Sequence, residues 1–223
     1  MEKDHKLTPF YTKLLEYANS NIVAHDVPGH KLGKVSNDMM LFTGPHMYML
    51  DANAPRGLDN LNRPTGVIGE AAELMADAFG AEKAYFLTGG TTMGILSMIM
   101  SVCRAKEKII LPRNVHKSAI NALILSGAIP IFVRPDIDNE LGIANHMSFK
   151  DVKKAIDENP DAKAVLVINP TYFGVTSDLK RIVDIAHKKD IMVLVDEAHG
   201  SHFPFSEMLP IGSMEAGADM GSC

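Results

Sequence analysis

The stretch Ile191-Met-Val-Leu-Val-Asp196-Glu-Ala-His199-Gly200 decides the fold predicted for this chain. Its first five residues are all apolar, three of them are β-branched, and an acid follows them directly. A run this short and this apolar predicts a strand buried on both faces of a parallel sheet. Ligands bind outside the carboxyl ends of such strands, which is where Asp196 falls. An isolated acid at such a place usually caps the next turn, so the other strand ends must decide between the two interpretations.

The bulk composition limits the function classes. The chain has 223 residues, of which 46% are hydrophobic, and a net charge of −5. This size suits one α/β domain, or one domain and part of a second. The acidic balance argues against nucleic acid or an anionic membrane as a partner, and no apolar run reaches transmembrane length. The N-terminus lacks the apolar segment of a signal peptide, and the two cysteines, Cys103 and Cys223, form no disulfide framework. We therefore expect a cytoplasmic protein.

The remaining pattern alternates between strands and helices. Apolar residues at helical spacing predict helices over 9–19 and 67–79, the second ending at Gly80. Short apolar runs predict strands over 84–87, 109–111, 129–133, 164–168 and 191–195. Helices are expected between them, ending near Cys103 and at Gly127 and beginning at Ser148 and Ser177. This alternation predicts a parallel sheet with right-handed crossovers.

The N-terminal third is less regular. Residues 22–64 are rich in His, Gly, Pro and Asp. Structureless loops of that length are uncommon in compact domains unless they are functional. We therefore expect an N-terminal helix and ordered arm over 1–64, and a large α/β domain over 65–223.

A glycine-rich turn, Thr88-Gly-Gly-Thr-Thr92, lies between a predicted strand and a predicted helix. Its glycines let the backbone approach a ligand, and free N–H groups at a helix start favour an anion. The turn has neither the lysine of a P-loop nor the Gly-x-Gly-x-x-Gly spacing of dinucleotide sites. A turn of this kind also occurs for chain geometry alone, but the apolar helix after it favours phosphate binding.

Other candidate residues have competing interpretations. Asp196-Glu-Ala-His199 spells a helicase box, which the missing P-loop and the acidic charge argue against. The pairs His25/His30 and His199/His202 lack a third ligand at recognisable spacing, so no metal site is expected. His116 either caps the helix that follows it or stacks on a flat heteroaromatic ring. A phosphate cradle, a stacking imidazole and an acid together are what pyridoxal 5′-phosphate requires.

Six motifs in order carry a resemblance to a known family: Val27-Pro-Gly-His-Lys31, Gly57-Leu-Asp-Asn-Leu61, Gly66-Val-Ile-Gly-Glu-Ala71, Arg113-Asn-Val-His-Lys-Ser118, Pro170-Thr-Tyr-Phe-Gly174 and Asp196-Glu-Ala-His-Gly200. The chain resembles the Orn/Lys/Arg decarboxylases, which are fold type I pyridoxal-phosphate enzymes. The resemblance covers nearly the whole chain. It implies a three-layer α/β/α domain with a mostly parallel sheet, incomplete at the C-terminus.

The resemblance also assigns roles to residues. Asp196 would pair with the pyridine nitrogen, and His116 and Ala198 would contact the two faces of the ring. Gly90, Thr91 and Thr92 would hold the phosphate, and Thr171 would lie near an oxygen substituent. His199 would lie close to the site with a less defined role. Gly89, Met93 and Ile95 depart from the polar residues usual in the phosphate turn, so Met93 is not expected to contribute a side-chain contact.

The family's Schiff-base lysine follows the aspartate by a few dozen residues, whereas no lysine follows Asp196 here. We therefore expect an N-terminal part of a longer homodimeric or higher oligomeric enzyme, inactive by itself. The expected reaction is decarboxylation of arginine, lysine or ornithine in polyamine metabolism. Two alternatives remain open: another reaction on the same cofactor, such as transamination or elimination, and a non-catalytic module that keeps the cofactor pocket.

Overall fold

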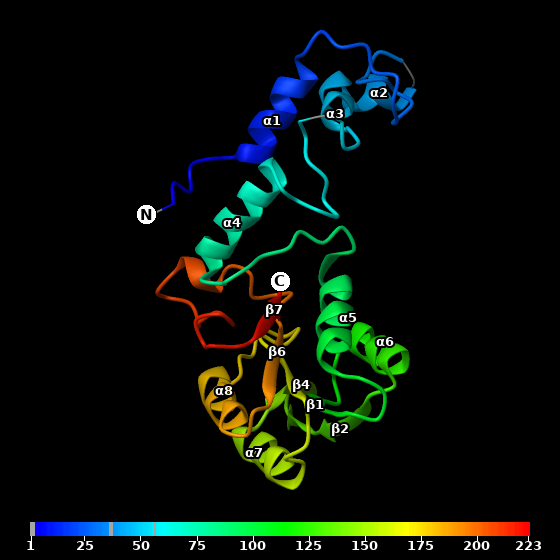
Figure 1. Cartoon of the computed structure of the whole chain (residues 1–223). Helices are drawn as coiled ribbons and strands as arrows, with labels where there is room; N and C mark the ends of the chain where they lie inside the picture. The colour runs from blue at the N-terminus through cyan, green and yellow to red at the C-terminus, as the bar shows by residue number, and fades with distance from the viewer. Residues whose placement is uncertain (1–2, 36–37, 56) are drawn as a thin grey trace. The chain divides into compact units, whose positions relative to one another are not determined.

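The structure is a computed structural model that describes residues 3–35, 38–55 and 57–223. The N-terminal helix and ordered arm predicted over 1–64 therefore include five positions, 1–2, 36–37 and 56, that lie outside the described residues. The chain forms two compact units, Met1–Phe86 and Leu87–Cys223 (Figure 1). The expected division at residue 64 stays a prediction.

The first unit is helical. It contains α1 (Pro9–Ala18), α2 (Asp38–Thr43), α3 (Pro45–Leu50) and α4 (Val67–Phe79). The structure confirms the two predicted helices, α1 and α4, which pack on each other. Gly80 ends α4 in the left-handed conformation, with a φ of 67°. The irregular arm holds α2 and α3, which the apolar pattern did not indicate.

A distant carboxylate caps the start of α4. Asp59 accepts hydrogen bonds from the backbone N–H groups of Thr65 (3.1 Å), Gly66 (2.8 Å) and Ile68 (3.1 Å). Desolvation would raise the pKa of Asp59, but backbone donors, led by Thr65, lower it to about 2. The acid in the motif 57–61 thus has a structural role, because it satisfies N–H groups that a helix start leaves free.

The second unit is built on a five-stranded sheet in which every pairing is parallel, in the order β2-β1-β5-β6-β7. Its strands are β1 (Lys108–Pro112), β2 (Ile129–Val133), β5 (Ala164–Ile168), β6 (Met192–Asp196) and β7 (Met220–Ser222). The strands predicted over 109–111, 129–133, 164–168 and 191–195 are confirmed, each end within one residue. From β1 the chain adds β2 on one side of the sheet, and from β5 it adds β6 and β7 on the other side. The strand order therefore changes direction between β1 and β5, and their carboxyl ends form a topological switch point.

Helices cover both faces of this sheet (Figure 1): α5 (Gly90–Val102) and α6 (Lys117–Ser126) lie on one side, and α7 (Phe149–Glu158) and α8 (Leu179–His187) on the other. Alternate residues of the strands point to opposite faces and belong to two hydrophobic cores. Ile109, Leu166 and Leu194 pack with α5 and α6, whereas Ile110, Val165 and Val193 pack with α7 and α8. The predicted three-layer α/β/α architecture with a mostly parallel sheet is therefore confirmed. A short 3-10 helix, η1 (Phe203–Phe205), follows β6.

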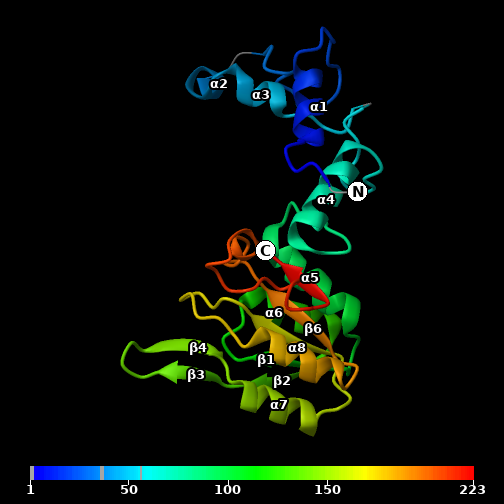
Figure 2. The ribbon, with the colours of Figure 1, turned by 90° about the vertical axis from the view of Figure 1, so that its left-hand side faces the viewer.

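Three sequence predictions differ from the structure. Residues 84–87 form no strand, since a strand needs a neighbour for its hydrogen bonds and these residues pair with no strand within the described chain. An antiparallel hairpin was missed, β3 (Pro135–Asp138) with β4 (Ile143–Met147), which extends beyond the sheet (Figure 2). The last α-helix begins at Leu179, with Asp178 rather than Ser177 as its N-cap residue. The Ser177 N–H and hydroxyl instead bond the Asn169 side chain at 2.8 Å and the Ile168 carbonyl at 3.4 Å.

No helix in the described part of the chain is long and apolar enough to cross a bilayer.

Candidate functional site

The carboxyl ends of β5, β6 and β7 lie side by side. Ile168, Asp196 and Ser222 are in register across the three strands. Beyond them, the Asn169 N–H donates to the Asp196 carbonyl and the Glu197 N–H donates to the Ser222 carbonyl, each at 2.9 Å. These bonds continue the ladder past the strands, so the residues after each strand hold fixed positions.

Asp196 is a buried acid at this edge, with 8% of its surface exposed. Its Oδ1 accepts a hydrogen bond from the Ala198 N–H at 3.3 Å. Burial raises the pKa of Asp196, and the Ala198 N–H and the His116 and His199 side chains oppose that rise. The structure therefore brings His116, Ala198 and His199 into the surroundings of Asp196. A cationic N–H group would complement this carboxylate, because a buried charge is costly until it is paired.

His116 caps α6, so one of the two interpretations from the sequence is confirmed. Its Nδ1 accepts a hydrogen bond from the Ser118 N–H at 3.3 Å and lies 2.9 Å from the Ser118 hydroxyl. Because Nδ1 is an acceptor, we assign the proton of the neutral ring to Nε2. The ring remains exposed, so capping fixes its orientation without covering it. Capping and stacking are thus compatible roles.

Ala198 and His199 occupy the turn after Asp196, and both are exposed. The His199 ring meets the Tyr172 ring edge to face, with centroids 5.6 Å apart. Tyr172 is itself 81% exposed and follows β5. This contact joins the turns that follow β5 and β6, at the carboxyl ends of the strands, where Asp196 also lies.

The turn at residues 88–92 opens α5. Gly90 has a φ of 63°, a conformation that favours glycine, and Gly89 is the N-cap residue without a side-chain cap. No acidic residue lies in the first turn, so the N–H groups of Thr91 and Thr92 suit an anion. The Met93 side chain lies back over Gly89. One turn further on, α5 packs directly on β7 at Gly94 and Ser222.

Thr171 is 2% exposed and lies in the tight turn after β5. Its Oγ1 accepts from the Val175 N–H at 3.2 Å, which leaves the hydroxyl proton free to donate. The site residues predicted from the sequence therefore come from four elements: Gly90, Thr91 and Thr92 from α5, His116 from the start of α6, Thr171 from the turn after β5, and Asp196, Ala198 and His199 from the end of β6.

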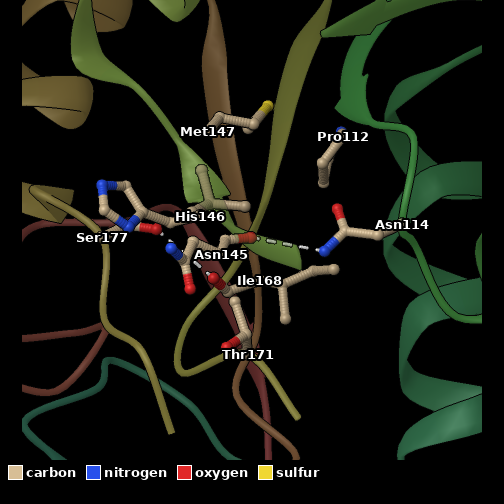
Figure 3. Close-up of a pocket in the computed structure, with 9 residues that line it drawn as sticks. Pro112, Asn114, Asn145, His146, Met147, Ile168, Thr171 and Ser177 are labelled. Carbon is tan, nitrogen blue, oxygen red and sulfur yellow. Dashed lines mark hydrogen bonds between the residues drawn. The ribbon is translucent and has the colours of Figure 1, made fainter. Parts of the chain in front are cut away.

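A hollow at the switch point between β1 and β5 adds residues that sequence reasoning missed (Figure 3). Thr171 lines it together with Asn114, Asn145, His146 and Ser177. The Asn114 Nδ2 donates to the Asn145 carbonyl at 3.4 Å. Asn145 and His146 belong to β4, so they were missed with the hairpin. The turn residues Asp138-Asn-Glu-Leu-Gly142 were the signal available in the sequence.

These residues fit pyridoxal 5′-phosphate. The uncapped start of α5 offers N–H groups to a phosphate, and the buried Asp196 carboxylate suits a protonated ring nitrogen. The exposed His116 side chain is held by the Ser118 N–H and lies within electrostatic reach of Asp196. These three groups therefore match the phosphate, the ring nitrogen and the ring face of the cofactor.

The comparison with known proteins decides the family. The profile of the Orn/Lys/Arg decarboxylase major domain matches residues 8–222. The chain belongs to the Orn/Lys/Arg decarboxylase family. Arginine decarboxylase of Bacillus subtilis (strain 168) is 48% identical to it over 216 residues, which are 96% of this chain and 44% of that protein.

Solved structures of lysine decarboxylases share the fold of this chain. Lysine decarboxylase A from Pseudomonas aeruginosa superposes with a TM-score of 0.80 at 26% identity, over 95% of this chain and 31% of that one. The constitutive lysine decarboxylase of E. coli, at 23% identity, shares the fold with a TM-score of 0.75 over 93% of this chain and 32% of that one. The chain thus spans less than half the length of these family members.

Proposed function

We propose that the protein is a pyridoxal-phosphate-dependent decarboxylase of a basic amino acid, namely arginine, lysine or ornithine. The observation that carries this proposal is the buried Asp196 at the carboxyl end of β6, with His116 and His199 close enough to act on its ionisation. The 48% identity to an arginine decarboxylase supports arginine as the first substrate to test.

Each site residue has a task in this proposal. When bound, the cofactor supplies an electron sink that stabilises the carbanion left by loss of CO₂. Asp196 would keep a proton on the ring nitrogen, because the anionic form of the acid favours a neighbouring cation. His116 and Ala198 would contact the two ring faces. The N–H groups of Thr91 and Thr92, with Gly90, would bind the phosphate, and the free hydroxyl proton of Thr171 would donate to an oxygen substituent.

Further features belong to the same proposal. The product would be an amine that enters polyamine metabolism, and the enzyme would be a cytoplasmic homodimer or higher oligomer. No lysine occurs among residues 197–223, so the lysine that holds the cofactor would lie outside this sequence. Residues 1–223 alone would then bind the cofactor without a covalent bond and would not decarboxylate an amino acid.

The test uses the longer protein that this proposal implies, called here the intact protein. It is titrated with pyridoxal 5′-phosphate, and CO₂ release from arginine, lysine and ornithine is measured. We expect cofactor binding and release from at least one substrate. Borohydride reduction followed by peptide mapping should label no lysine within residues 1–223. Absence of cofactor binding, or of CO₂ release from all three substrates, would contradict the proposed function. A labelled lysine within residues 1–223 would contradict the predicted place of the covalent bond.

A further inference from the structure

Glu197 is a buried acid that the proposed chemistry leaves without a task. It follows Asp196 directly, yet only 2% of its surface is exposed. Consecutive residues at a strand end point to opposite sides. The Asp196 carboxylate accepts from the Ala198 N–H and lies within electrostatic reach of His116 and His199, whereas the Glu197 side chain bonds a segment sixteen residues further along the chain.

Ser213 supplies two donors to this carboxylate. Its backbone N–H donates to Glu197 Oε1 at 2.8 Å, and its hydroxyl donates to Oε2 at 2.6 Å. Both donors are neutral, so burial still raises the pKa of Glu197. An acid in such a place is costly compared with an apolar side chain of the same size, which suggests that it has a task beyond packing.

The backbone of Glu197 is tied to both sides of the site. Its N–H donates to the Ser222 carbonyl of β7 at 2.9 Å, and its carbonyl accepts from the Gly200 N–H at 2.8 Å. Gly200 leaves no room for change, since a Cβ there would lie 2.8 Å from Glu197 Cγ and 2.8 Å from Pro170 Cδ. Gly200, which ends the turn that carries Ala198 and His199, is therefore packed between the side chain of Glu197 and the turn after β5.

We infer that Glu197 is a positioning residue: its bonds to Ser213 hold the turn 197–200 so that Asp196, Ala198 and His199 face the bound cofactor. The inference rests on the proposed function, because the cofactor gives the orientation its purpose. Glu197 does not touch the reacting atoms in this scheme and acts only through the turn.

The experiment compares four variants of the intact protein. Glu197→Met keeps the side-chain length and removes both acceptors, and Ser213→Ala removes one donor. Glu197→Gln keeps an acceptor for the Ser213 N–H and can donate to the Ser213 hydroxyl, so it is the rescue variant. Glu207→Gln changes an exposed acid of the same loop region and is the matched control. For each protein we would measure the dissociation constant and absorbance spectrum of bound pyridoxal 5′-phosphate below the melting temperature, and hydrogen exchange by peptide.

We expect Glu197→Met to weaken cofactor binding at least tenfold, to change the spectrum, and to raise exchange in the peptide 196–201 while the strand 164–168 stays protected. Glu197→Gln should restore most of the affinity, and Glu207→Gln should match wild type. Ser213→Ala should have a smaller effect, because it removes only the hydroxyl donor and leaves the Ser213 N–H bonded to Glu197.

Two outcomes overturn the inference while leaving the proposed function intact. In the first, Glu197→Met binds the cofactor with wild-type affinity and an unchanged spectrum. In the second, exchange rises equally over 196–201 and 164–168, which would mean that Glu197 serves only global stability. If wild type itself binds no cofactor, the proposed function fails and the inference falls with it.

Discussion

Gly94 of α5 lies directly against Ser222 of β7. A Cβ at Gly94 would come within 2.8 Å of Ser222 Cβ and closer still to its hydroxyl. Ser222 is also the register partner of Asp196. This contact therefore links the helix that would bind the phosphate to β7, the strand paired with the one that carries Asp196.

Gly94→Ala should push α5 away from β7. Overpacking of this kind costs about 1–3 kcal/mol, more than the gain of up to about 1 kcal/mol that alanine brings to a helix interior. We expect a lower free energy of unfolding in urea and weaker binding of pyridoxal 5′-phosphate. Ser97→Ala, on the exposed side of the same helix, is the control and should be neutral or slightly stabilising. If Gly94→Ala is as stable as wild type, α5 and β7 can move apart without cost and the close contact is not needed for stability.

Asp196→Asn should abolish most activity while keeping the fold. The amide is nearly isosteric with the acid but cannot favour a proton on the ring nitrogen. Steady-state CO₂ release measures the loss, and circular dichroism checks the fold. Near-normal turnover would mean that Asp196 is a structural residue.

The same variant tests the pH dependence of stability. Burial raises the pKa of Asp196 in the folded state above its unfolded value of about 3.9. The folded state then binds this proton more tightly, so the acid costs progressively more stability as pH rises from about 4 through the folded pKa. We expect cofactor-free Asp196→Asn to gain stability relative to wild type over that range. Urea unfolding at several pH values measures the difference, and a constant difference would contradict the raised pKa.

Two substitutions of His116 distinguish its role as a helix cap from its proposed role as a stacking partner of the cofactor ring. His116→Asn keeps a good N-cap and removes the ring, whereas His116→Ala removes both. We expect His116→Ala to lose about 1 kcal/mol of stability and His116→Asn to lose little. Both should weaken cofactor binding by roughly 0.5–1.5 kcal/mol, by analogy with aromatic pairs. If His116→Asn binds the cofactor like wild type, the ring does not stack and His116 is only a helix cap.

Asp59→Ala should loosen the start of α4. The backbone donors that lower the pKa of Asp59 to about 2 would lose their acceptor. Because the folded pKa lies below the unfolded one, the wild-type acid stabilises above about pH 4, and this contribution disappears as pH falls towards 2. Hydrogen exchange of residues 65–69 should rise in the variant at pH 7, and Glu82→Gln, an exposed acid after α4, should leave it unchanged. Equal exchange in both variants would argue against the cap.

The sequence by itself determined the elements whose pattern is local. The apolar run at 191–195 is a buried strand with Asp196 at its end, and the periodic residues 67–79 are α4 with Gly80 as its cap. The six motifs, present in the same order as in the family, indicated the family without coordinates. Local patterns suffice here, since strand and helix periodicities record which faces of an element are buried.

Only the tertiary structure decided what depends on partners distant in sequence. Residues 84–87 have strand-like composition but pair with no strand among the residues that the structure describes. The hairpin containing Asn145 and His146 became visible only through its pairing. Asp59 caps a helix that begins eight residues later, and Glu197 bonds Ser213 across sixteen residues. Hydrogen bonds of this kind form where the chain brings donors and acceptors together, and that meeting depends on the packing of the whole unit rather than on the spacing of residues along the chain.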